Sequence, residues 1–228
     1  MIKIEKVEVF GWEAAIRGLR NPMNSWDKSD SYNSDDCEFC GAGDFIIGEN
    51  DLKLMKSLSK AGDDHGKFLR MINVTLDITA PLYWWKEFDT YKVGTVANSC
   101  STMHKITAKE FEMSDFSFEH LTAGAIEDVA KPIVNVLNGA REAYLNFDEY
   151  NAKDPEGWDE GIKDKKDIWW QIIQLLPSSY NQKRTVQLNY QVLKSMYLAR
   201  KHHKLDEWRE FCEWCETLPY FCEVVLGE

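Results

Sequence analysis

Polar side chains that could bind a small ligand gather in the segment after residue 89. They are hydroxyls and amides together with one lysine: Thr90, Lys92, Thr95, Asn98, Ser99, Ser101 and Thr102. Hydroxyls and amides donate and accept hydrogen bonds, and a lysine adds a positive point charge. Loops with such groups carry function more often than the scaffold that holds them. The pattern is typical of one wall of a ligand pocket, and an ordinary solvated loop is the alternative.

A pattern typical of a half-buried strand precedes this loop. Within residues 69–79, polar residues alternate with the apolar residues Ile72, Val74, Leu76 and Ile78. This period of two predicts a strand with one buried face. Pro81 has no N–H to donate, so the ladder is expected to end there. A short aromatic segment, residues 83–88, then leads into the polar loop.

The frame of this region resembles the flavin-dependent thymidylate synthases, the ThyX family. Their signature is Arg-His-Arg, then Ser-X-Arg after seven or eight residues, placed just after a strand that ends in Ala-Pro. Here Ala80-Pro81 is present, and Thr90-Tyr91-Lys92 occupies the position of the Arg-His-Arg triplet. Ser101 follows after eight intervening residues, with Met103 in place of the last arginine.

The C-terminal half strengthens the resemblance. Family members have Leu-Pro, then an Asn twelve residues after the Pro, then an Arg eleven residues further on. Leu176-Pro177, Asn189 and Arg200 keep both spacings. Eleven residues are close to three helical turns, so Asn189 and Arg200 are expected on one face of a helix. The resemblance covers the chain except residues 21–48.

The resemblance implies both a fold and a reaction. The expected fold is α/β (α+β), with a mixed sheet and a helical layer, in a single domain 1–228. Residues 21–48 would be an acidic, cysteine-containing insertion loop. The family transfers a methyl group to C5 of the pyrimidine deoxynucleotide dUMP, with carbon from methylenetetrahydrofolate and hydride from reduced FAD. It also implies a homotetramer with active sites between subunits.

The resemblance assigns roles to seven residues. It implies a catalytic and substrate-binding role for Ser101. Three more residues are expected on the nucleotide substrate: Lys92, Asn98 and Arg200. Three are expected at the flavin: Tyr91, Thr95 and Asn189.

Several family positions have changed in ways that weaken phosphate binding. Thr90 and Met103 replace arginines that bind two phosphate oxygens at once, and Glu87 stands where the family has a Gln. Each lost charged hydrogen bond costs roughly 1.5–3 kcal/mol. One alternative is therefore a non-catalytic protein that binds or sequesters a nucleotide or another small ligand. A second is a structural protein that meets a partner through residues 21–48.

Two cysteine pairs have the spacing of zinc ligands, Cys37-X-X-Cys40 and Cys212-X-X-Cys215. The second pair has a simpler explanation, because Trp208, Phe211, Cys212 and Cys215 recur at helical spacing as a core stripe. No metal is therefore assigned, and zinc is an alternative that the sequence leaves open.

Charge and hydropathy exclude several classes of function. The net charge is −11, from 27 basic and 38 acidic residues. A nucleic-acid polymer is not an expected partner, because phosphate backbones require a basic surface. No apolar run is long enough to span a membrane, and the N-terminal residues do not resemble a signal peptide. A cytoplasmic protein with reduced cysteines is expected.

The remaining pattern predicts mainly helices. A further strand is expected at residues 2–10, and helices at 12–20, 51–61, 107–114, 124–150, 165–176, 186–201 and 204–217. Arg17 and Arg20 on the first helix are candidates for anion binding, with a solvated helix face as the alternative. Long loops such as 21–48 are functional or disordered in most compact domains.

Overall fold

The computed structural model describes residues 2–34, 45–159 and 161–227. The chain divides into two compact units. The first, here called the helical unit, contains Thr79–Lys86 and Ser99–Arg184. The second, the sheet unit, contains Ile2–Ile78, Glu87–Asn98 and Thr185–Glu228. Two compact units can be parts of one domain, so the expectation of a single domain stays a prediction.

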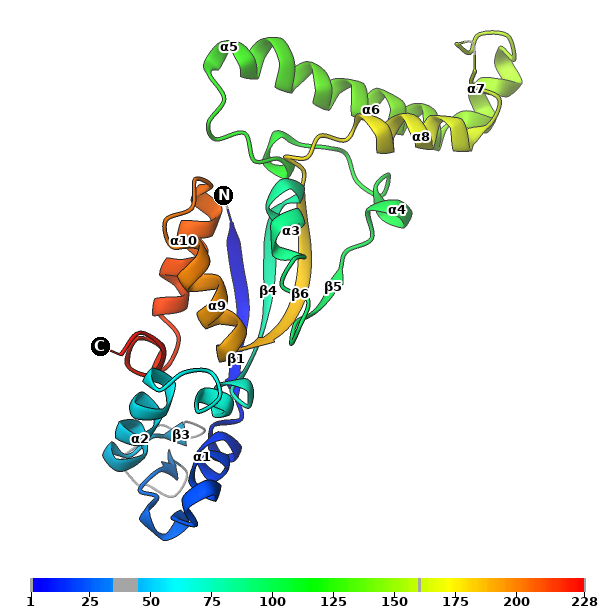
Figure 1. Cartoon of the computed structure of the whole chain (residues 1–228). Coiled ribbons are helices and arrows are strands. Elements are labelled where there is room, and N and C mark those ends of the chain that lie inside the picture. The colour runs from blue at the N-terminus through cyan, green and yellow to red at the C-terminus, as the bar shows by residue number, and fades with distance from the viewer. Residues whose placement is uncertain (1, 35–44, 160, 228) are drawn as a thin grey trace. The chain divides into compact units, whose positions relative to one another are not determined.

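The described part of the chain forms two sheets (Figure 1). One has four strands in the order β1-β4-β6-β5, and β2 pairs antiparallel with β3 in the other. The strands are β1 (Lys3–Phe10), β2 (Tyr32–Asn33), β3 (Phe45–Ile46), β4 (Asn73–Pro81), β5 (Val96–Ser99) and β6 (Asn181–Asn189). β4 and β6 contribute residues to both units.

The helices belong to both units as well. They are α1 (Trp12–Arg20), α2 (Glu49–Lys60), α3 (Leu82–Phe88), α4 (Thr102–Lys105), α5 (Ala123–Ala125), α6 (Lys131–Leu145), α7 (Phe147–Lys153), α8 (Lys165–Leu175), α9 (Tyr190–Arg200) and α10 (Asp206–Glu216). The expected α/β class, a sheet with a helical layer, is confirmed. No helix in the described ranges is both long enough and apolar enough to cross a lipid bilayer.

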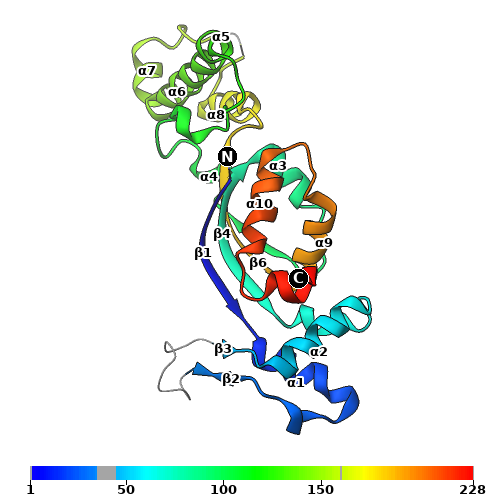
Figure 2. The same cartoon turned by 90° about the vertical axis from the view of Figure 1, so that its left-hand side faces the viewer.

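In the sheet unit, α9 and α10 lie side by side over one face of the sheet (Figures 1 and 2). The predicted alternation in β4 is confirmed, because Val74, Leu76 and Ile78 are fully buried. Large aromatic side chains of α9, α10 and the segment after them are fully buried: Tyr190, Trp208, Phe211 and Phe221. The Tyr190 hydroxyl donates to the carbonyl of Pro219 (2.6 Å), so this buried polar group is satisfied.

In the helical unit, α6 packs along α8. Buried side chains of α6, α8 and the segment 106–116 form one cluster: Ile106, Phe111, Phe116, Val134, Leu137 and Ile172. The predicted helix at 107–114 is wrong. The Asn138 side chain accepts from the N–H of Phe111 (2.8 Å) and donates to its carbonyl (2.9 Å), so α6 satisfies backbone groups that a helix would have paired internally.

The predicted helix at 186–201 is wrong in its first part. Residues up to Asn189 belong to β6, and the helix begins at Tyr190. Val186 and Leu188 are buried while Thr185 and Gln187 are exposed, which is the period of a strand. The following apolar helix obscured this short alternation in the sequence.

A buried ion pair joins α1 to α2. Arg20 Nε donates to Asp51 Oδ1 at 2.6 Å, and the two side chains are 4% and 0% exposed. The other carboxylate oxygen of Asp51 accepts from the hydroxyls of Ser29 and Ser31, each at 2.7 Å. The Arg20 guanidinium is therefore engaged within the fold, whereas Arg17 is exposed and lies 3.6 Å from Glu13.

We expect Asp51→Ala to lower the free energy of unfolding by about 3–5 kcal/mol, because it leaves a buried guanidinium unpaired. Burial alone would raise the Asp51 pKa, but hydrogen bonds from Ser31, Ser29 and Arg20 bring it below its ordinary value. A carboxyl whose pKa is lowered by folding stabilises above its unfolded pKa and loses that contribution as the pH falls through the folded pKa. The deficit of the variant should therefore shrink below about pH 4.

Urea unfolding of both proteins between neutral and acid pH measures this difference. Arg17→Ala is the matched control, because it breaks an exposed pair, and it should cost less than about 0.5 kcal/mol. Equal losses of unfolding free energy in the two variants would show that the buried ion pair stabilises the fold no more than the exposed pair does.

Candidate ligand-binding site

A pocket of about 510 Å³ lies in the sheet unit, between the loop after α3 and the first turns of α9. Its lining residues are Asp63, Arg70, Thr90, Tyr91, Lys92, Val93, Gly94, Asn189, Gln191, Val192 and Ser195. The volume is within the range of small-molecule sites. Three residues expected from the sequence at a ligand are brought together here: Tyr91, Lys92 and Asn189.

Gly94 allows the loop to lie against the helix. Its φ of +78° is in the left-handed region, which glycine adopts without steric cost. A Cβ added here would lie 3.1 Å from Asn189 Nδ2 and 3.2 Å from Val192 Cγ2. The close approach of loop and helix therefore depends on this glycine.

Asn189 is held by the junction of β6 and α9. Its Oδ1 accepts from the N–H of Val192 (3.1 Å), which makes it the N-cap of α9. The next residue, Tyr190, donates its N–H to the carbonyl of Ile72 (3.0 Å). The cap occupies the amide oxygen, which leaves the amide nitrogen as the group next to Gly94.

Four polar residues of the pocket were not expected from the sequence: Asp63, Arg70, Gln191 and Ser195. Gln191 Nε2 donates to Asp63 Oδ1 (3.1 Å). Gln191 Oε1 is buried and, among the described residues, has no hydrogen-bond partner. Such an acceptor costs free energy unless an N–H or a water reaches it. The available signal for Gln191 was its place in the first turn after Asn189, whereas Asp63 and Arg70 come from a distant segment.

Arg200 is engaged in an ion pair beside the pocket. Its Nη1 lies 2.9 Å from Glu87 Oε2, and its Nε donates to the Tyr91 hydroxyl (3.0 Å). The same Glu87 oxygen accepts from Trp208 Nε1 (2.9 Å) and lies 3.3 Å from His203 Nε2. These contacts hold the Tyr91 hydroxyl and leave the Arg200 guanidinium less able to bind a phosphate.

The other expected site residues lie elsewhere in the chain. Asn98 is exposed on β5, and Thr95 Oγ1 is buried without a hydrogen-bond partner among the described residues. Ser101 belongs to the helical unit, where it is the N-cap of α4 and accepts from the N–H of His104 (3.1 Å). The roles assigned to these three residues stay predictions.

The cysteines described by the structure do not support a zinc site. Cys212 and Cys215 lie on the buried face of α10. Burial raises the pKa of the Cys212 thiol to about 11 and raises that of Cys215 well above its ordinary value. Zinc binds thiolates, so this pair is better explained as core. Cys37 and Cys40 lie outside the described residues, and within the described ranges no three His, Cys, Asp or Glu residues form a metal-type group.

No protein-family model and no curated protein sequence matches this chain. Its structure, however, is similar to solved structures over nearly its whole length. One is Thymidylate Synthase X (ThyX) from Helicobacter pylori with FAD and dUMP, at a TM-score of 0.65 and 15% identity, covering 100% of this chain and 98% of the other. Another is flavin-dependent thymidylate synthase ThyX from the same organism, complexed with FAD and dUMP. Its TM-score is 0.64 and its sequence identity is 16%, and the match covers 99% of this chain and 98% of the other. The ThyX-like fold implied by the sequence is therefore confirmed, and at this identity the likeness shows the fold alone.

We expect Gly94→Ala to destabilise the protein more than Gly62→Ala does. Both glycines have a positive φ, but a Cβ at Gly62 would meet nothing within 4 Å. Backbone strain affects both variants and is no smaller at Gly62 (φ +109°) than at Gly94 (φ +78°), so the extra loss at Gly94, about 1–3 kcal/mol, reports the contact with α9. Urea unfolding measures the free energy of unfolding of both variants. Equal losses of this free energy would show that the loop does not need the close approach to α9.

Proposed function

We propose that this protein binds a nucleotide, with FAD as the first candidate, in the pocket lined by Tyr91, Lys92 and Asn189, and that it does so without thymidylate synthesis. The observation that carries the proposal is the assembly of these residues into one pocket on a ThyX-like scaffold. The solved structures with this fold hold FAD and dUMP, which supports a nucleotide as the ligand.

The donor set of the pocket fits a nucleotide. Arg70 and Lys92 supply two positive charges for a phosphate, and Asp63 is the one acidic side chain that the described part of the chain adds to the lining. The buried Gln191 Oε1 lacks a donor within the described ranges, and uracil and flavin rings both carry an imide N–H of the kind that it would accept. The side chains of Val93 and Val192 offer an apolar wall for such a ring. Bound FAD would supply hydride-transfer chemistry.

The pairing of Arg200 with Glu87 favours binding over catalysis. Family enzymes need strong charge complementarity to hold dUMP, and the resemblance expects Arg200 to contribute to it. Here that guanidinium lies 2.9 Å from a carboxylate, so its charge is largely compensated. Thr90 and Met103 supply no replacement for the two lost arginines. A nucleotide held mainly by Arg70 and Lys92 would lack the forked contacts of the family pose.

Flavin-dependent transfer of a one-carbon group to a pyrimidine deoxynucleotide is the second candidate. It is favoured by Tyr91, whose hydroxyl is held by Arg200 at the position where the family has its flavin-facing histidine. In that case Ser101 would be the catalytic serine and Asn98 a substrate contact. The homotetramer and the cytoplasmic location implied by the resemblance stay predictions.

The first experiment is a visible absorption spectrum of the purified protein, repeated after addition of FAD and gel filtration. We expect a retained flavin band. Lys92→Met and Arg70→Met should each weaken FAD binding about tenfold, equivalent to about 1.4 kcal/mol, because each removes a charge from the pocket. Lys53→Met, an exposed lysine on α2, is the control and should bind as the parent does.

A colourless protein that does not retain added FAD would contradict the flavin assignment, and dUMP titration would then test whether any nucleotide binds. Failure of both would refute the nucleotide proposal. If FAD is retained, dUMP-dependent oxidation of the reduced flavin with methylenetetrahydrofolate separates the two candidates, because turnover would establish the enzyme.

We expect Glu87→Gln to strengthen dUMP binding by about tenfold, roughly 1.4 kcal/mol, since it releases the Arg200 guanidinium from its carboxylate partner. The gain should fade with added salt. Calorimetric titration measures both effects. Glu156→Gln removes the same charge at an exposed position of the helical unit and controls for net charge. A loss of affinity, or an equal gain in the control, would show that the pair does not limit phosphate binding.

A further inference from the structure

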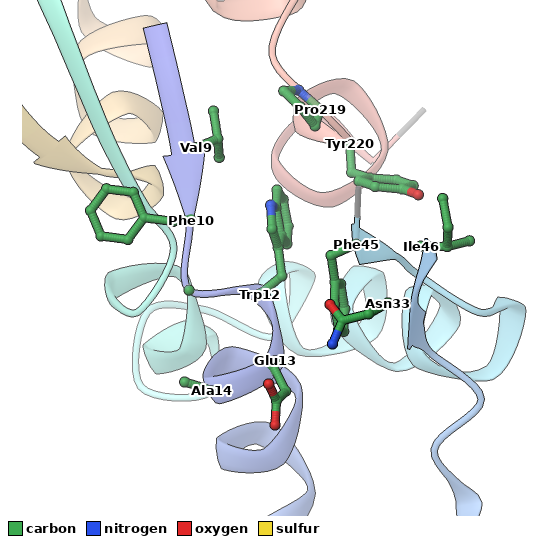
Figure 3. A pocket seen from close by; sticks show the side chains of 11 residues that line it. Val9, Phe10, Trp12, Glu13, Ala14, Asn33, Phe45, Ile46, Pro219 and Tyr220 are labelled. Atoms are coloured by element: carbon green, nitrogen blue, oxygen red, sulfur yellow. The ribbon is translucent and has the colours of Figure 1, made fainter. Parts of the chain in front are cut away.

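Another pocket of the sheet unit shares no residue with the candidate site. Its volume is about 660 Å³, and it lies where three segments meet: the turn from β1 into α1, the paired strands β2 and β3, and residues 219–220 (Figure 3). Its lining residues are Val9, Phe10, Gly11, Trp12, Glu13, Ala14, Asn33, Phe45, Ile46, Pro219 and Tyr220. We call it the aromatic pocket.

Three aromatic rings face a common space in this pocket. Figure 3 shows Trp12, Phe45 and Tyr220 around it, with Phe10 on the other side of β1. The rings of Trp12 and Tyr220 meet edge to face, with centroids 5.6 Å apart. The centroid of the Trp12 ring also lies 5.3 Å from that of the buried Tyr190 ring, and the Trp12 residue is only 7% exposed. The indole is therefore held in place before any ligand arrives.

Tyr220 occupies an unusual backbone conformation. Its φ of +55° is in the left-handed region, which is strained for a bulky residue. Its hydroxyl accepts from the N–H of Ile47 (3.2 Å), just after β3. Strain of this kind persists only where the surroundings impose it, and it gathers at ligand sites. The conformation places the tyrosine ring on the pocket wall.

Among the described residues, the pocket lining has one charged side chain, the carboxylate of Glu13. This side chain is 71% exposed and lies 3.6 Å from Arg17, an exposed pair of small energetic weight. The faces of aromatic rings carry negative potential and attract cations, most strongly for tryptophan and tyrosine. Aromatic walls beside a carboxylate therefore complement a positive charge on an apolar body.

We propose that the aromatic pocket binds a small alkylammonium ligand, with Trp12, Phe45 and Tyr220 around the alkyl groups and Glu13 near the charge. An anion matches this lining less well, because the Glu13 carboxylate would repel it. A neutral hydrocarbon also matches less well, because it would gain no attraction from that carboxylate. This inference is independent of nucleotide binding, because the two pockets have separate linings.

Choline and its neutral isostere 3,3-dimethylbutan-1-ol test the proposal, since they share a shape and differ in charge. The readouts are calorimetric titration of the full chain and the NMR shift of the Trp12 indole N–H. Choline is expected to bind at least tenfold more tightly than the isostere and to shift that signal. No binding of choline, or equal binding of the two compounds, would overturn the proposal.

Three variants locate the site. Glu13→Gln and Phe45→Leu should each weaken choline binding at least threefold, whereas Glu8→Gln, an exposed acid on β1 outside the lining, should leave it unchanged. Circular dichroism and urea unfolding confirm that each variant is folded. Equal effects of Glu13→Gln and Glu8→Gln would overturn the role of the carboxylate. Retained binding in both Glu13→Gln and Phe45→Leu would overturn the site itself.

Discussion

One carboxylate oxygen, Glu87 Oε2, organises the region beside the candidate site. It pairs with Arg200 at 2.9 Å and accepts from Trp208 Nε1 at the same distance, and through Arg200 it holds the Tyr91 hydroxyl. The C-terminal end of α9 is thereby tied through Arg200 to Glu87 of α3 and to Tyr91 in the segment after it. At the other end of α9, the N-cap Asn189 lies so near Gly94 that a Cβ there would be 3.1 Å from its Nδ2. The loop between these ties carries Lys92 and forms one wall of the pocket. The same pair that orders the wall also compensates the charge of Arg200.

Two pockets of the sheet unit, the candidate site and the aromatic pocket, differ in chemistry. The candidate site combines Arg70 and Lys92 with a buried acceptor on Gln191, which suits a phosphate attached to a polar ring. The aromatic pocket combines rings with a carboxylate, which suits a cation. The buried pair of Arg20 and Asp51 joins α1 to α2 and gathers Ser29 and Ser31 around the carboxylate. It thus orders the segment that leads into β2, beside the aromatic pocket.

Elements with a long, regular pattern were predictable from the sequence. The alternation predicted within residues 69–79 corresponds to β4, Asn73–Pro81, and the helical spacing of α8 and α10 also matches the structure. The helix expected at 107–114 fails because the Asn138 side chain satisfies the backbone of Phe111 from another element. The N-terminal part of the helix expected at 186–201 is the end of β6. The sequence did not reveal this strand, because an alternation with only two buried residues is too short to recognise.

The sequence by itself determined the local frame of the protein: a strand ending at Pro81, a polar loop after it, and a helix with Asn189 and Arg200 near its two ends. These features depend on neighbouring residues and on spacing. Only the tertiary structure decided that Arg200 pairs with Glu87, that Asp63 and Arg70 join the pocket, and that Trp12 meets Tyr220. Contacts between distant segments depend on packing geometry, and a single sequence carries no local signal for them.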